Sequence, residues 1–212
     1  MSFLKLEEIN YAYKNGQEVL KGINMEFEQG KVYAIVGPSG CGKTTLLSLL
    51  GGLDAPSGGA IKINGENIDQ KGLLYYRKNQ VAFVFQQFNL IDYLTAAENV
   101  SLLTEKSPYA MLKVVGLDEE HAKRSVLQLS GGQQQRVAVA RALMSDAKLL
   151  LADEPTGNLD EETAAGITRL LKDSAHQMNK CVIVVTHSHE LAGRADVVFQ
   201  LKKGELEVAE IA

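Results

Sequence analysis

The chain has 212 residues, of which 45% are hydrophobic and 23% charged, and its formal net charge is −4. This composition excludes an intrinsically disordered chain, and the acidic balance gives no electrostatic footprint for nucleic acid. No signal-peptide pattern opens the sequence, and the longest apolar runs are far shorter than the ~20 residues that cross a bilayer. The two cysteines also suit a reduced, cytosolic setting. If the protein works at a membrane, we therefore expect it to do so through a partner.

The chain opens with two short segments of alternating polarity, residues 3–13 and 22–27, separated by the turn sequence KNGQ. Segments of the same kind follow at 59–68 and, towards the end of the chain, at 196–211. Alternation broken by glycine- and asparagine-containing turns is typical of antiparallel strands. We therefore predict a small antiparallel layer beside the core, formed by these four segments.

A buried strand at 31–37 leads into the string GPSGCGKTT and then into a helical pattern at 43–53. The string matches the phosphate-binding loop G-x-x-x-x-G-K-[ST] in its required place between a strand and a helix. Gly40 and Gly42 let successive amides turn inward as an anion-binding nest, and the helix N-terminus adds a partial positive charge. Lys43 would reach the β- and γ-phosphates, and the hydroxyl that follows it can ligate Mg²⁺. The sequence thus predicts ATP and Mg²⁺ bound at Gly37, Pro38, Ser39, Gly40, Cys41, Gly42, Lys43, Thr44 and Thr45.

Residues 87–143, which follow a second buried strand at 81–86, contain no convincing further strand. Three helical patterns occur in this stretch, at 95–105, 109–116 and 119–129. We predict that the stretch is a helical insertion into the core.

The helix that ends this insertion begins with Ser130, Gly131 and Gly132, although glycine is about 1 kcal/mol less favourable than alanine in a helix. Such a helix start offers a second set of free amides and a second positive dipole end. One nucleotide does not need two such cradles from the same chain. We therefore expect this one to cover the nucleotide of another copy, in a head-to-tail dimer that encloses two ATP molecules. Arg136 and Arg141, further along the helix, could contact phosphates, but a solvated position or an interdomain salt bridge is an equal alternative for each.

A strand at 147–153 ends at Asp153, which can hold Mg²⁺ through water, and Glu154 follows at once. A carboxylate just past a strand tip is well placed to polarise a water molecule in line with the γ-phosphate. The pattern continues with a helix, a strand and a helix at 161–178, 181–187 and 188–195. This alternation of buried strands and helices predicts an α/β core with a mostly parallel sheet.

The string LSGGQ at 129–133 resembles the signature of the ATP-binding-cassette (ABC) superfamily and stands between the two phosphate motifs in that family's order. The resemblance covers essentially the whole chain and implies one ABC ATPase domain over residues 1–212. Residues 1–86 and 144–212 would form a P-loop NTPase core with the antiparallel β layer. Residues 87–143 would form a small helical subdomain that includes the signature.

The resemblance also implies roles for single residues. Gln86 matches the Q-loop glutamine, which would sense Mg²⁺ and the attacking water, and His187 matches the switch histidine, which would hydrogen-bond the γ-phosphate. Tyr13 matches the aromatic residue that stacks on adenine, with Tyr11 on the same strand face as the alternative. Asp160 in GNLD matches the D-loop, which would cross the dimer interface. The full assignment is catalysis by Glu154, His187, Lys43 and Gln86, Mg²⁺ binding by Thr44, Gln86 and Asp153, and contacts to ATP in trans by Ser130, Gly131, Gly132, Gln133 and Asp160.

The wording FVFQQFNLI…ENV…LSGGQQQRVAVARAL…LADEPTGNLD is more specifically similar to the ATPase subunits of bacterial lipoprotein-releasing, macrolide-export and antimicrobial-peptide exporters. It implies an ATP-dependent homodimer that drives a separate membrane permease from the cytoplasmic face of the cell membrane. The stretch from Asn89 to Gln128 is shorter than this family leads us to expect. The alternative function, a soluble ABC ATPase acting on DNA or ribosomes, is disfavoured because the chain lacks a second cassette, long coiled-coil insertions and basic tracts.

Overall fold

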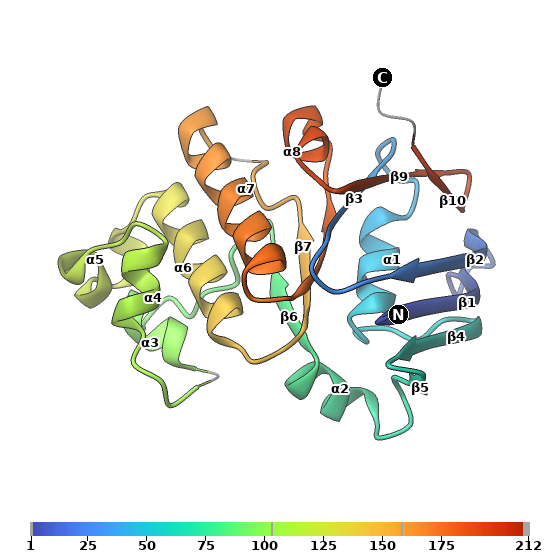
Figure 1. Cartoon of the computed structure of the whole chain (residues 1–212), viewed down its shortest axis with the longest axis horizontal. Helices are drawn as coiled ribbons and strands as arrows, with labels where there is room; N and C mark the ends of the chain where they lie inside the picture. The colour runs from blue at the N-terminus through green and yellow to red at the C-terminus, as the bar shows by residue number, and fades with distance from the viewer. Residues whose placement is uncertain (1, 103, 158, 210–212) are drawn as a thin grey trace.

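Two sheets form the frame of the computed structural model, which describes residues 2–102, 104–157 and 159–209 (Figure 1). The larger sheet has the strand order β10-β9-β3-β8-β7-β6. Its strands are β3 (Val32–Val36), β6 (Val81–Val84), β7 (Leu149–Asp153), β8 (Cys181–Val185), β9 (Val197–Lys202) and β10 (Glu205–Val208). All neighbours in this sheet are parallel except β10, which is antiparallel to β9. The four strands predicted from apolar runs are therefore confirmed as adjacent parallel strands in this sheet.

The smaller sheet has the order β2-β1-β4-β5, and its neighbours are all antiparallel. Its strands are β1 (Leu4–Ala12), β2 (Glu18–Phe27), β4 (Gly58–Ile63) and β5 (Glu66–Asn67). Leu4 lies opposite Phe27 on one side and Ile63 on the other, so one face of the sheet carries a continuous apolar row. The predicted antiparallel layer is confirmed for the three segments from the N-terminal part of the chain.

The closing segment does not belong to that layer, and this part of the prediction is wrong. Strand β9 pairs in parallel with β3, and β10 extends the larger sheet by a hairpin. Val198, Phe199 and Leu201 of β9 are buried, as expected for a strand inside the core. The turn sequence correctly indicates the antiparallel hairpin, but it carries no information about the strand on the other side of β9.

Helix α1 (Lys43–Leu50) lies between the two sheets, and four of its leucines are buried there in one apolar cluster with both sheets (Figure 1). Burial of a leucine side chain contributes about 1.5–3 kcal/mol relative to leaving it exposed. The helix ends against Phe83 of β6, because a Cβ atom on Gly51 would stand 1.9 Å from the Cζ atom of that ring. The packing therefore fixes the position of α1 against both sheets.

Helices α6 (Gly131–Met144) and α7 (Glu161–His176) cover the other face of the larger sheet (Figure 1). Against α6 pack the short helices α3 (Ala96–Ser101) and α4 (Tyr109–Val114). The remaining helices are α2 (Leu73–Asn79), which the sequence analysis did not predict, α5 (Glu119–Lys123) and α8 (His189–Gly193). Among its described residues, the stretch 87–143 thus has several short helices before α6, joined by irregular segments, and no named strand.

The helix predicted at 119–129 stops at Lys123 for an identifiable reason. The Arg124 carbonyl accepts a hydrogen bond from the Ala96 amide at 3.0 Å, and the Val126 amide donates to the Leu94 carbonyl at 3.2 Å. These residues therefore use their backbone groups in a bridge to the segment before α3, and only a 3₁₀ turn at Val126–Gln128 follows.

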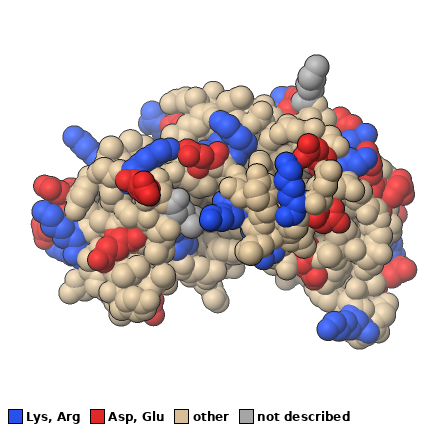
Figure 2. All heavy atoms as spheres, turned by 90° about the horizontal axis from the view of Figure 1, so that it is seen from below, with Lys and Arg blue, Asp and Glu red and all other residues tan. Residues whose placement is uncertain are grey.

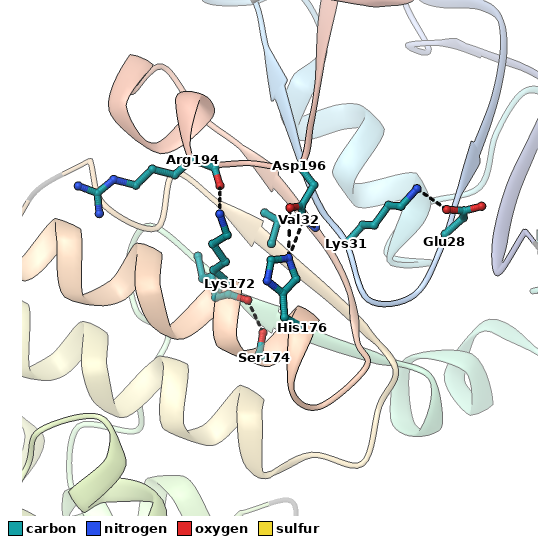
Figure 3. A network of polar contacts seen from close by, with 9 residues as sticks. Glu28, Lys31, Val32, Lys172, Ser174, His176, Arg194 and Asp196 are labelled. Atoms are coloured by element: carbon teal, nitrogen blue, oxygen red, sulfur yellow. Dashed lines mark hydrogen bonds and ion pairs between the residues drawn. The ribbon is translucent and has the colours of Figure 1, made fainter.

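A polar cluster joins the end of α7 to the starts of β3 and β9 (Figure 3). The Val32 amide donates to Asp196 Oδ2 at 2.7 Å, and the Asp196 amide donates to the Val32 carbonyl at 2.9 Å. His176 Nε2, at the last residue of α7, lies 2.9 Å from the same carboxylate oxygen. One carboxylate thus fixes where two parallel strands begin and where a helix ends.

Among the described residues, none of the helices combines the length and apolar character that crossing a bilayer demands. On the face shown in Figure 2, acidic and basic side chains are interspersed rather than gathered into one basic stripe.

Candidate nucleotide-binding site

The phosphate-binding loop joins the end of β3 to the start of α1. Gly42 is the N-cap of α1 with φ 106° and ψ 11°, a left-handed conformation suited to glycine, and no described side chain caps this helix. A Cβ atom on Gly42 would stand 2.7 Å from Val19 Cγ1, and one on Gly37 would stand 2.3 Å from the Leu201 carbonyl oxygen. The loop therefore has room only for glycine at these positions, and the first amides of α1 are left free for an anion.

Lys43 is held by the same loop. Its side chain is buried, and Nζ donates hydrogen bonds to the carbonyl oxygens of Gly37 at 2.9 Å and Pro38 at 3.1 Å. His187 Nε2 lies 3.2 Å from the same ammonium group. The cation is thus kept at the centre of the loop, where a polyphosphate would be enclosed.

Thr44 and Asp153 bring two oxygen atoms together beside Lys43. Thr44 Oγ1 donates to Asp153 Oδ1 at 3.5 Å, across from α1 to the end of β7. Burial raises the pKa of the Asp153 carboxyl above its usual value of 3.8, helped by the charge of Glu154, while Thr44 and Lys43 act in the opposite direction. Hydroxyl and carboxylate oxygens are the ligands that Mg²⁺ prefers, and a bound cation would remove the unfavourable burial of this charge. These residues fit a Mg²⁺ ion.

Glu154 and His187 face each other at the carboxyl ends of β7 and β8. Glu154 Oε2 accepts a hydrogen bond from the His187 amide at 3.1 Å, and Oε1 lies 3.5 Å from His187 Nε2. Glu154 has φ 45°, a conformation that costs a residue other than glycine on the order of 1–3 kcal/mol. The surroundings therefore hold this carboxylate in a conformation that a free chain would avoid.

These side chains line one pocket of about 580 Å³. Its wall consists of Tyr13, Gln17, Val19, Ser39, Gly40, Gly42, Lys43, Thr44, Thr45, Gln86, Asp153, Glu154, Gly157 and His187. The structure therefore brings together the residues predicted to act within one chain, while Gly37 and Pro38 support Lys43 from behind. The Cys41 amide, next to the wall, donates to the Pro38 carbonyl at 3.3 Å.

The structure separates the two candidate tyrosines. Tyr13 is 45% exposed on the pocket wall, with its hydroxyl 3.0 Å from Thr45 Oγ1. The Tyr11 hydroxyl instead donates to Asp54 Oδ2 at 2.5 Å, and this hydrogen bond raises the pKa of Tyr11 and lowers that of Asp54. The two rings meet edge to face at 5.4 Å. Tyr13 is thus the tyrosine available to a ligand in the pocket.

Three wall residues were missed by sequence reasoning: Gln17, Val19 and Gly157. The turn KNGQ contained a signal for the first, because the Tyr13 amide donates to the Gln17 carbonyl at 3.0 Å across that turn. Val19 meets the pocket only because β2 crosses the phosphate-binding loop, which no local pattern predicts.

The residues predicted to act in trans lie outside the wall of this pocket. Ser130 is the N-cap of α6 and forms a capping box with Gln133, in which Ser130 Oγ accepts from the Gln133 amide at 3.3 Å. Gly132 packs against the first turn of α7, because a Cβ atom there would stand 3.0 Å from Thr163 Cγ2. The Thr163 amide donates to Asp160 Oδ1 at 2.9 Å, so Asp160 caps α7.

Gly131 is exposed at the start of α6, and Asn158 of the GNLD sequence lies outside the described residues. Arg136 and Arg141 also lie outside the pocket wall, and both donate to backbone carbonyls of their own chain. In this protomer the signature residues thus form a capped, outward-facing helix start that does not reach the chain's own phosphate-binding loop.

Comparison with known proteins gives one consistent result. The family model described as ABC transporter matches residues 20–157. An uncharacterized ABC transporter ATP-binding protein of Bacillus subtilis, YclH, is 47% identical over 221 residues, which covers 99% of this chain and 98% of that protein. The lipoprotein-releasing system ATP-binding protein LolD of Legionella pneumophila is 40% identical over 223 residues, which covers 98% of each chain.

A solved structure is similar over the whole chain. It is a dimeric structure of a post-hydrolysis state of the ATP-binding cassette MJ0796, from Methanocaldococcus jannaschii, bound to ADP and Pi. The TM-score is 0.87 at 38% identity, with 99% of this chain and 100% of that chain covered. This likeness confirms the predicted fold, a P-loop α/β core with an antiparallel layer and a helical part.

Proposed function

Since the chain belongs to the ABC transporter family and is an ATPase, we propose that two copies enclose two ATP molecules and drive a separate membrane permease. Each site would combine the phosphate-binding loop of one copy with the signature helix of the other. The observation that carries this proposal is the separation within one protomer: the pocket has Lys43 and Glu154, whereas Ser130 faces outward. The dimeric form of the ADP- and Pi-bound relative supports it.

We assign the chemistry to the residues of the pocket wall. Lys43 would exchange its loop carbonyls for phosphate oxygens, and the free amides of α1 would bind the same group. Glu154 would accept a proton from the attacking water, with His187 donating a hydrogen bond to the γ-phosphate. Tyr13 would stack on the adenine.

A Mg²⁺ ion would be held by Thr44, Gln86 and Asp153, and it would neutralise charge on the phosphate oxygens. In trans, Ser130, Gly131, Gly132, Gln133 and Asp160 would complete the site from the second copy. The outward-facing start of α6 supports this arrangement, since its amides and dipole suit a phosphate group.

We further propose that residues 87–143 form the subdomain that meets the permease, and that residues 1–86 and 144–212 form the core. A groove of about 280 Å³ between β6 and α6 has mostly apolar walls that include Phe85 and Leu102, and Arg77 and Arg141 also line it. The transported process would be export or extraction of a peptide, lipoprotein or drug, and the name of the relative LolD favours release of lipoproteins. Such a subunit would work on the cytoplasmic side of the membrane, attached through its permease.

The substitution Glu154→Gln tests the proposal. Loss of a general base lowers turnover by about 10²–10⁴-fold, while ATP binding persists because the phosphate-binding loop is intact. The variant should then accumulate as a dimer when ATP is added, which light scattering measures directly. The matched control is Lys43→Ala, which should weaken ATP binding in calorimetry and remain monomeric. A Glu154→Gln variant that hydrolyses ATP at the normal rate, or stays monomeric while saturated with ATP, would contradict the proposal.

A further inference from the structure

The loop that follows Gln86 has an unusual backbone. Phe88 has φ 56° and Asn89 has φ 47°, so two successive residues other than glycine adopt the left-handed conformation. This conformation costs an L-residue roughly 1–2 kcal/mol, less for asparagine than for a bulky side chain. Such a loop stays in place only when its surroundings hold it there.

Arg141 of α6 holds this loop. Its guanidinium group donates from Nη2 to the Phe88 carbonyl at 3.1 Å and from Nη1 to the Asn89 carbonyl at 2.7 Å. Burial lowers the pKa of Arg141. Within the described part of the chain, no carboxylate lies within ion-pair distance of it. The two left-handed carbonyls are therefore its polar partners, and the planar fork of arginine suits such a pair better than lysine does.

A second contact joins the same loop to the other end of α6. A Cβ atom on Gly131 would stand 3.8 Å from Cζ of Phe88, so the aromatic ring lies beside this signature glycine. Gly131 and Arg141 are ten positions apart in α6, which is roughly 15 Å along an α-helix at 1.5 Å per residue. The loop after Gln86 thus contacts α6 near both of its ends. It cannot shift without breaking these contacts or moving the helix with it.

At its other end the loop carries Gln86 into the nucleotide pocket. Gln86 lines the pocket, and its Nε2 atom would stand 3.6 Å from a Cβ atom on Gly157. We infer that Arg141 is a positioning residue: it fixes the left-handed loop that keeps Gln86 on the pocket wall, and it fastens that loop to the helix whose start serves the second copy. The inference rests on the proposed function, because it takes Gln86 to act at the bound nucleotide.

The chain offers a matched control on the same helix. Arg136 also donates to a backbone carbonyl, but through one bond of 3.4 Å to Val115, which is not part of the loop after Gln86. Arg136→Met and Arg141→Met therefore remove the same side-chain groups from α6, and only the second releases the loop.

Hydrogen exchange of residues 86–90 in the nucleotide-free protein is the first measurement. Arg141→Met should raise exchange in this segment about tenfold or more, as expected when a strained loop loses about 1.4 kcal/mol or more of support. Arg136→Met should leave it unchanged. Arg141→Lys keeps the charge but not the planar guanidinium group, so its exchange rate at residues 86–90 should lie between those of Arg141→Met and wild type. If Arg141→Met does not fold, Arg141→Lys alone provides the test. Unchanged exchange in both Arg141 variants would overturn the inference.

Steady-state kinetics is the second measurement. Misplacing a catalytic group by about 1 Å can cost on the order of 10²-fold, so Arg141→Met should lower kcat ten- to a hundredfold. ATP affinity should stay within about twofold, because the phosphate-binding loop is not touched. A simple loss of stability would instead lower the active fraction and raise exchange throughout the core, rather than selectively at residues 86–90.

Gln86→Ala separates failure of the inference from failure of the proposed function. If Gln86→Ala loses turnover and Arg141→Met does not, the positioning role is wrong while the assignment of Gln86 stands. If Gln86→Ala keeps full turnover, the assignment of Gln86 is wrong, and the exchange data alone decide whether Arg141 holds the loop. When the two substitutions are combined, the inference requires that kcat fall no further than in Gln86→Ala.

Discussion

Tyr11, in β1, and Tyr13, just past the end of that strand, have different surroundings. Tyr13 is exposed on the pocket wall, whereas the Tyr11 hydroxyl is engaged by Asp54. Base–aromatic stacking contributes about 1–3 kcal/mol per base. We therefore expect Tyr13→Ala to raise the Kd for ATP about tenfold, measured by calorimetry at fixed Mg²⁺ concentration.

Tyr11→Ala is the control for this prediction. It removes a ring of the same size and the hydrogen bond to Asp54, so we expect lower thermal stability but a Kd for ATP within about twofold of wild type. If Tyr11→Ala raised the Kd for ATP and Tyr13→Ala did not, Tyr11 would be the adenine contact.

At the residue scale, motifs with fixed spacing could be predicted because their chemistry is local. The phosphate-binding loop needs glycine, lysine and a hydroxyl in sequence, and the strand that precedes it can be recognised from its apolar run. The hold of Arg141 on Phe88 could not be predicted in this way. The sequence FNL at residues 88–90 contains no glycine that would indicate a left-handed turn, and Arg141 lies more than fifty residues further along the chain.

At the element scale, Asp196 connects the starts of β3 and β9 with the end of α7 (Figure 3). Burial alone would raise the pKa of Asp196, but the Val32 amide and His176 outweigh it and hold that pKa below its usual value of 3.8. A carboxyl with a lowered pKa stabilises the folded state above its unfolded pKa. That contribution is lost as the pH falls through the folded value.

The substitution Asp196→Asn should therefore lower Tm at pH 7, because the amide keeps an acceptor for Val32 but not the charge. A hydrogen bond to a charged group contributes about 1.5–3 kcal/mol, and about 1.5 kcal/mol corresponds to a Tm loss of roughly 3–6 °C for a chain of this size. The difference from wild type should shrink below about pH 4, the range in which a carboxyl of this kind becomes protonated. Thermal melts followed by circular dichroism at pH 7 and below pH 4 measure it. A Tm difference that stays constant with pH would show that the charge of Asp196 plays no part.

Strands with both faces covered were the most predictable elements. Each of β3, β6, β7 and β8 lies within two residues of its predicted range, since a continuous apolar run leaves few other assignments. The place of β9 and the early end of α5 could not be predicted, because both depend on hydrogen bonds to distant segments. Sequence patterns report which faces are apolar, whereas strand neighbours are decided by tertiary pairing.

At the scale of the whole molecule, the two-copy site makes a prediction about mixtures. Ser130→Arg should block only the signature helix start that completes the partner's site. Glu154→Gln should inactivate only the pocket of the chain that carries it. Each variant alone should hydrolyse little ATP. Mixed in equal amounts before ATP is added, the two should recover roughly a quarter of wild-type turnover, because half of the dimers then have one intact site of two.

The control for the mixture is the doubly substituted chain combined with either single variant, which should recover nothing. ATPase assays at several total protein concentrations measure both. Activity of the mixture equal to the average of its parts would show that each copy works with its own residues alone.

The contacts of Lys43 have a consequence for how the site is loaded. Its ammonium group is already buried and hydrogen-bonded to the carbonyls of Gly37 and Pro38, so the loop keeps its shape before a nucleotide binds. Pre-organisation of this kind removes the ordering penalty from the first encounter. Nucleotide exchange in a lone protomer should then be quick and reversible, and commitment to hydrolysis should wait for the second copy to close over the bound triphosphate.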